Sequence, residues 1–149
     1  FNELVVSGLI LTIFLCESPD VRVEEDFREH LGLVKDSIRE AYVEQLAGLG
    51  VEEVHLKEWE TLIGLRYDEY VKEKLEVRQV AMDIESQKSD LTAESMDKIR
   101  QRLPVQTVAI GCHDHICRGE TSGRDDLLRL IVQWLGRFYG ELRTRIEKS

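Results

Sequence analysis

An uncharged apolar run near the start of the chain most limits how this sequence can fold. Residues Leu4–Cys16 read LVVSGLILTIFLC and contain no charged side chain. This run is too short for a transmembrane helix, which needs about 20 apolar residues. It also lacks the basic leader of a signal peptide, because Asn2 and Glu3 precede it. We therefore expect it to lie in the protein core. Its β-branched residues and continuity favour a strand buried on both faces, with a core helix as the alternative.

Length and charge narrow the class of protein. The 149 residues are 42% apolar, which predicts a single compact domain over residues 1–149. The 29 acidic residues outnumber the 20 Lys and Arg residues, giving a net charge of −9. Duplex DNA and anionic lipid surfaces need clustered basic residues, so we expect no nucleic-acid partner. We also expect no membrane partner, unless residues preceding Phe1 have been removed. Three cysteines cannot all pair within one chain, which favours a reducing compartment, the cytoplasm.

Helical periodicity is clearest in the first half of the chain. A helix is predicted after Glu24–Asp26, whose charges suit a helix N-terminus, and is stopped by Gly48 and Gly50. Its apolar face consists of Phe27, Leu31, Val34, Ile38, Tyr42, Leu46 and Leu49. A second helix starts near Leu56, and residues 75–84 either extend it or form a strand. If extended, its broken heptad would include Tyr70 and Val77 and could join two copies of the chain or bind a protein partner.

The second half is predicted to alternate between helix and strand. After a polar loop at Ser86–Asp90, a short helix capped by Thr92 ends before Pro104. Val105–Gly111 is predicted to be a second buried strand. A final helix opens at Asp125 and Asp126, with Trp134 and Phe138 on its inner side.

These elements predict a helix-rich α/β domain with a small, mainly parallel sheet; a mostly-α bundle is the alternative. If Leu4–Cys16 and Val105–Gly111 are parallel strands, Cys16 and Cys112 emerge at the carboxyl edge of the sheet. Ligand sites in open α/β sheets gather at that edge.

The segment from Cys112 to Cys117 (CHDHIC) is the densest group of potential metal ligands in the chain. Zinc takes thiolate and imidazole ligands, and the Cys112-x-x-His115 spacing can hold it. We predict a zinc site formed by Cys112, His115 and Cys117, with Cys16 or His113 as further ligands. Asp114 would orient a ligand, and zinc-bound water would serve a hydrolase or lyase.

The same segment offers a nucleophile. Cys112-x₅-Arg118 would let a loop of backbone N–H groups hold an oxyanion while the Cys112 thiolate attacks phosphorus. The string Cys112…Ile116-Cys117-Arg118 resembles the loop of low-molecular-weight tyrosine phosphatases and related arsenate reductases. The match covers about seven residues, and the interior His-Asp-His and the following Gly119-Glu120 depart from that family. Asp20, a loop carboxylate close to Cys16 in the sequence, is the nearest candidate for a general acid.

The order of Cys16 and the later His113–Cys117 segment also resembles the zinc ligands of β-type carbonic anhydrases, although the spacing differs. That resemblance implies zinc-bound water as nucleophile, with Asp20 and Arg22 nearby. The alternative to all of these enzymes is an acidic regulatory or protein-interaction domain without catalytic activity.

Overall fold

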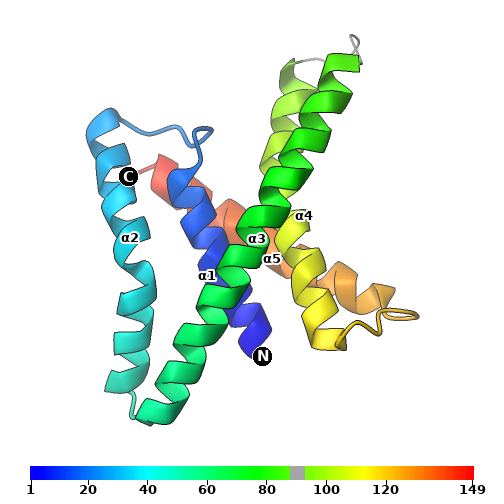
Figure 1. Ribbon diagram of the computed structural model, residues 1–149. Helices are drawn as coiled ribbons and strands as arrows, with labels where there is room; N and C mark the ends of the chain where they lie inside the picture. The colour runs from blue at the N-terminus through cyan, green and yellow to red at the C-terminus, as the bar shows by residue number, and fades with distance from the viewer. Residues whose placement is uncertain (88–92) are drawn as a thin grey trace.

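The computed structural model describes residues 1–87 and 93–149, which form five α-helices and, within these residues, no β-strand. The helices are α1 (Asn2–Glu17), α2 (Glu25–Gly48), α3 (Glu53–Gln87), α4 (Ala93–Cys117) and α5 (Asp125–Glu147) (Figure 1). The prediction of an α/β domain with a parallel sheet is therefore wrong, and the alternative of a mostly-α bundle describes the chain.

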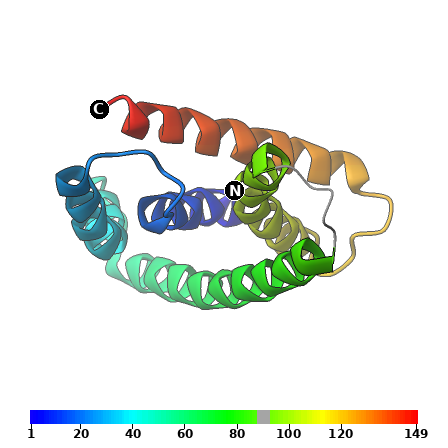
Figure 2. The same cartoon turned by 90° about the horizontal axis from the view of Figure 1, so that it is seen from above.

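The apolar run is the central helix of the bundle. Seen from above, α1 is enclosed by α5 and α3 on opposite sides and by α2 and α4 on the other two (Figure 2). Buried residues occur all around α1, and an all-round apolar surface is typical of a helix in the middle of a core. Its two hydroxyl side chains donate hydrogen bonds within the helix, from Ser7 to the carbonyl of Glu3 (2.7 Å) and from Thr12 to that of Gly8 (2.9 Å).

The predicted strand Val105–Gly111 lies inside α4. Its exposed residues Gln106 and Ile110 are four apart and are followed by Asp114, which is the spacing of one helix face. The predicted helix end before Pro104 is also wrong, because α4 continues through Pro104 for three more turns. The predicted cap Thr92 and most of the predicted loop Ser86–Asp90 lie outside the described residues.

Three predicted helices are confirmed. The helix after Glu24–Asp26 is α2, which ends at Gly48, and Gly50 follows with a φ of 89°. Residues 75–84 extend α3, so the choice between helix and strand resolves to helix. The final helix is α5, beginning at Asp125 as predicted. The predicted inner position of Trp134 is wrong, because this side chain is exposed.

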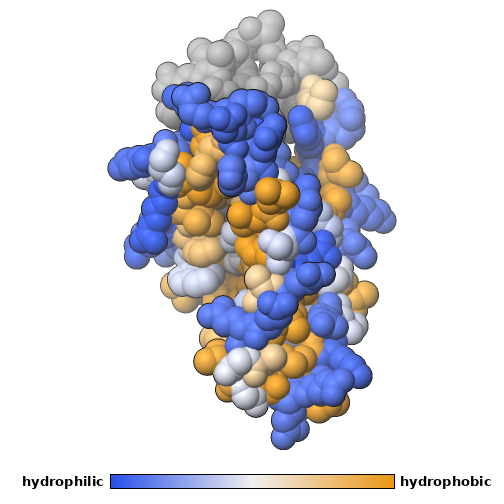
Figure 3. Space-filling model, turned by 90° about the vertical axis from the view of Figure 1, so that its left-hand side faces the viewer, coloured by the Kyte–Doolittle hydropathy of each residue, from blue (hydrophilic) through white to orange (hydrophobic). Residues whose placement is uncertain are grey.

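One continuous core joins the helices. Its fully buried members come from α1, the following loop, α3, α4 and α5, and Tyr42 and Val43 of α2 pack against them. Tyr42 also meets Trp59 of α3 edge to face, with ring centroids 5.7 Å apart. On the side where α2 lies, apolar residues interrupt the hydrophilic surface (Figure 3), and α2 itself buries only Leu31. No described helix is long and apolar enough to span a membrane.

The helices α3 and α4 approach each other closely at a glycine. The ring of Tyr70 is fully buried and lies against Gly111, where an added Cβ would be only 2.4 Å from the Tyr70 Cε1 atom. Tyr70 is therefore part of the core, and its predicted role in a contact between two copies of the chain is wrong. Whether the chain forms oligomers remains a prediction.

Candidate functional site

The segment from Cys112 to Cys117 forms the last turns of α4 rather than a loop. Successive side chains on a helix point about 100° apart, so the five potential ligands are spread around the helix instead of converging. The backbone N–H groups of this segment lie within helical structure. They do not form the open loop that a Cys-x₅-Arg phosphatase uses to hold an oxyanion.

The two cysteines that were predicted to meet at a sheet edge lie apart. Cys112 is fully buried near Ser7 and Tyr70, whereas Cys16 lies at the other end of α1, nine residues or about 13 Å further along. Burial raises the pKa of both thiols, and the Glu17 carboxylate raises that of Cys16 further. Both residues are therefore thiols at neutral pH, whereas an activated nucleophile needs the thiolate.

The two histidines of the segment have structural partners. The Nε2 atom of buried His113 lies 3.0 Å from the carbonyl oxygen of Arg124, which ties α4 to the start of α5. The Nε2 atom of His115 lies 2.9 Å from both carboxylate oxygens of Glu69 on α3. Each imidazole thus holds two parts of the bundle together.

The His115–Glu69 contact belongs to a larger polar network between three helices. Arg66 of α3 donates two hydrogen bonds to the Glu3 carboxylate of α1, at 2.9 and 2.8 Å. A third nitrogen of Arg66 lies 3.6 Å from Glu69. Hydrogen bonding to Glu3 raises the pKa of Arg66, and burial beside Glu69 raises the pKa of Glu73. The network fixes the register of α1, α3 and α4.

The remaining predicted site residues, except Cys117, lie on the surface. Asp114 is exposed on α4, and Arg118 is exposed just beyond it, with a left-handed φ of 53°. Asp20 lies in the loop between α1 and α2, where its carbonyl oxygen accepts a hydrogen bond from Arg143. Buried Cys117 completes the set. Within residues 1–87 and 93–149, no three His, Cys, Asp or Glu side chains are placed to hold a metal ion. The zinc site stays a prediction without geometric support in these residues.

A different feature, a pocket between α4 and α5, is a candidate binding site. It has a volume of about 450 Å³, which is within the usual range for small-molecule sites. The residues that line it include both apolar side chains and polar hydrogen-bond donors. From α4 they are Arg102, Val105 and Gln106, and from α5 they are Val132, Gly136, Tyr139, Gly140 and Arg143.

Two glycines one turn apart on α5 create the space. An added Cβ at Gly136 would have Val105 as its nearest neighbour, at 3.8 Å, and one at Gly140 would meet nothing within 4 Å. Larger side chains at these positions would fill the gap between the helices. The pocket therefore results from missing side chains on a helix that is otherwise strongly amphipathic.

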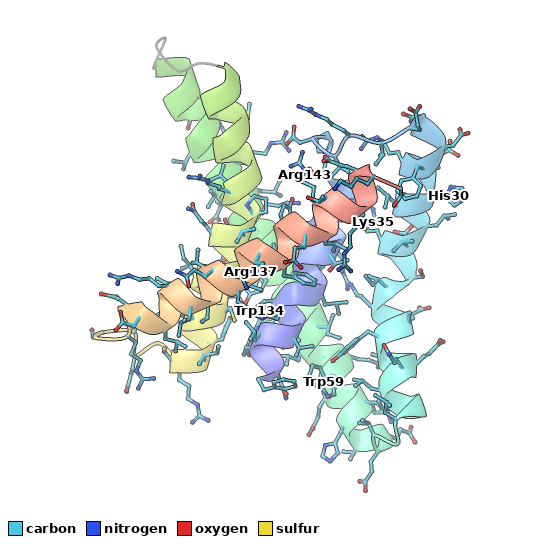
Figure 4. The ribbon with its side chains drawn as sticks, turned by 180° about the vertical axis from the view of Figure 1, so that it is seen from behind. His30, Lys35, Trp59, Trp134, Arg137 and Arg143 are labelled. Carbon is cyan, nitrogen blue, oxygen red and sulfur yellow. The ribbon has the colours of Figure 1, made fainter. Side chains whose placement is uncertain are left out.

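The two arginines of the pocket differ in their pairing. Arg143 donates from Nε to the Glu147 carboxylate (3.0 Å) and from Nη2 to the Asp20 carbonyl (2.7 Å). These bonds hold its guanidinium in place and partly neutralise its charge. Arg102 is exposed and has no ion pair or hydrogen bond with any described residue. Figure 4 shows α5 from behind, with Trp134 and Arg137 near its middle and Arg143 near its C-terminal end.

Tyr139 adds a neutral donor. Its side chain is buried, and burial raises the pKa of its phenol, so the hydroxyl is protonated at neutral pH. No expectation from the sequence pointed to this pocket. The signal that could have indicated it is Gly136-x-x-x-Gly140, a pair of small residues on one face of the last helix, followed by Arg143 on that same face.

Comparison with known proteins finds no matching family model, no matching curated protein and no matching solved structure.

Proposed function

We propose that this chain is a non-catalytic helical binding domain whose ligand is a small molecule held between α4 and α5. The observation that carries the proposal is the pocket itself, whose lining combines apolar residues with four polar donor side chains. A few polar groups around an apolar surface are typical of sites that bind and orient a small organic ligand.

The lining favours binding over chemistry. The described lining residues include no carboxylate, imidazole or thiol, which are the groups that most often transfer protons or attack a substrate. Burial raises the pKa of the Cys16 and Cys112 thiols, which is opposite to what an activated nucleophile needs. This proposal keeps the expectation of a regulatory domain and moves its site from Cys112–Cys117 to the α4–α5 pocket.

The binding domain is further proposed to work in the cytoplasm. All three cysteines are free and buried, which supports a reducing compartment without depending on the pocket.

A pair of glycine variants tests the binding function. Ligand-observed NMR with a fragment library of mixed charge is expected to give hits with the wild-type protein. Gly140→Leu should abolish the main group of hits by filling the pocket, and the fold tolerates it because open space surrounds that position. The matched control is Gly32→Leu on α2, which also has nothing within 4 Å of an added Cβ and lies outside the pocket. A hit list that is unchanged by Gly140→Leu would contradict the proposal.

A further inference from the structure

We infer that the pocket selects an amphipathic anion: a carboxylate or phosphate headgroup attached to an apolar body. This inference depends on the proposed binding function and specifies the ligand class. It is carried by the juxtaposition, in the lining of one pocket, of the donor residues Arg102, Arg143 and Tyr139 with Val105, Val132 and two glycines.

The headgroup is assigned from the polar donors. An arginine guanidinium matches the two oxygens of a carboxylate or phosphate, and a phenol adds one further hydrogen bond. Arg143 is already oriented by Glu147 and Asp20, and its Nη1 group is left over after those bonds. Arg102 supplies the charge that no described residue neutralises. The headgroup is therefore expected to sit between the two arginines. Its affinity is expected to depend more on the charge of Arg102 than on that of Arg143.

The apolar body of the ligand is assigned from the apolar lining residues. Val105 and Val132 present methyl groups from the two helices, and Gly136 and Gly140 leave the helix surface flat between them. Only a narrow or planar hydrocarbon gains contact with both helices there, because a bulky polar group would leave its own hydrogen bonds unpaired.

The charge of the whole protein makes this site unusual. With a net charge of −9, the chain as a whole repels anions. At the pocket the local charge differs from that of the whole chain. Two arginines line it, and one of them, Arg143, is paired with the carboxylate of Glu147. A ligand with the opposite charge would be drawn to most of the surface but repelled at this pocket.

Four eight-carbon probes with different headgroups test the inference by isothermal titration calorimetry: octanoate, octyl phosphate, octanol and octylammonium. We expect the two anions to bind, octanol to bind at least about tenfold more weakly than the better anion, and octylammonium to bind weakest at the pocket. The two anions distinguish a carboxylate headgroup from a phosphate headgroup.

Variants connect the affinity to the pocket. Arg102→Gln should weaken binding of the anions by about three- to tenfold and leave octanol unchanged. The matched control is Arg137→Gln, which removes the same charge from exposed α5 surface outside the lining, and should leave all affinities unchanged. Gly140→Leu should remove binding of both anions and octanol.

The outcomes separate this inference from the binding function beneath it. Equal affinities for octanol and octanoate, both lost in Gly140→Leu, would overturn the anion selectivity and leave the binding function standing. Anion binding that Gly140→Leu leaves intact would overturn the assignment to this pocket. Equal losses in Arg102→Gln and Arg137→Gln would show a general charge effect and would also overturn it.

Discussion

Replacing Gly111 with alanine tests the closest approach of two helices in the bundle. The added methyl group would lie 2.4 Å from Cε1 of Tyr70, 3.2 Å from Cζ and 3.3 Å from Cδ1. Ordinary contact between carbon atoms is about 3.5–4.0 Å. Tyr70 is fully buried and surrounded by core residues, so its ring cannot move aside without displacing its neighbours.

Two effects of opposite sign set the magnitude. Overpacking a close-packed core costs about 1–3 kcal/mol, and alanine in place of glycine in a helix gains up to about 1 kcal/mol. We expect a net loss of about 1–2 kcal/mol in the free energy of unfolding, which lowers Tm by roughly 2–8 °C for a chain of this size. Urea unfolding followed by far-UV circular dichroism measures it.

The control is Gly64→Ala in α3, where an added Cβ meets nothing within 4 Å. It should stabilise the protein by up to about 1 kcal/mol, opposite in sign to Gly111→Ala. In the Tyr70→Leu background, Gly111→Ala should cost less stability than it does in the wild-type protein, because the aromatic ring that the added methyl group would meet is gone. If Gly111→Ala stabilises the protein as much as Gly64→Ala does, the proposed packing of α3 on α4 is wrong.

Three further predictions concern buried and charged groups. The buried Tyr70 hydroxyl forms no hydrogen bond with any described residue, so Tyr70→Phe should leave stability unchanged or raise it by about 1 kcal/mol in the same urea assay; a loss above about 1 kcal/mol would reveal a hidden bond. Burial by itself raises the pKa of Glu147, but hydrogen bonds from the Arg22 backbone and the Arg143 side chain outweigh it and lower the pKa. Its stabilisation is therefore present above the unfolded-state pKa of about 4.3 and is lost as pH falls through the lower folded-state value. Glu147→Gln should cost roughly 1 kcal/mol at neutral pH, and thermal melts should show the difference vanishing in acid; a difference that is independent of pH would contradict this. Elemental analysis of reduced, tag-free protein should find no stoichiometric zinc, and near-stoichiometric zinc that Cys112→Ser removes would contradict the geometric account.

The sequence predicted helices well where one face of the helix meets water. The apolar positions of α2 and α5 recur at three- and four-residue steps because the other positions are solvated, so periodicity identifies these helices. The acidic residues at the start of both helices, such as Asp125 and Asp126, also marked where they begin.

Elements buried on several sides were mispredicted for one physical reason. Leu4–Cys16 is enclosed by four helices, so no polar positions reveal its period, and its β-branched residues indicated a strand. Burial contributes far more than the few tenths of a kcal/mol by which such residues disfavour a helix. Pro104 was taken as a helix end, although α4 continues through it.

The candidate site could not be derived from the same information. Because Cys112–Cys117 contains many potential metal ligands, their side chains were expected to meet at one metal ion. A helix instead spreads neighbouring residues around its axis, and the hydrogen-bond partners of His113 and His115 lie on other elements. The pocket depends on how α4 crosses α5 and on side chains that Gly136 and Gly140 lack. Sequence spacing can indicate a small-residue face, but the space beside it exists only after the helices pack.

The most direct test of the central claim is a methyl-NMR titration of the protein with octanoate. Val105 of α4 and Val132 of α5 both line the pocket. We predict that their methyl resonances shift together and saturate, while those of Val34 and Val54, exposed on α2 and α3, stay in place. Shifts that are spread over the exposed valines, or that fail to saturate, would contradict a binding site between α4 and α5.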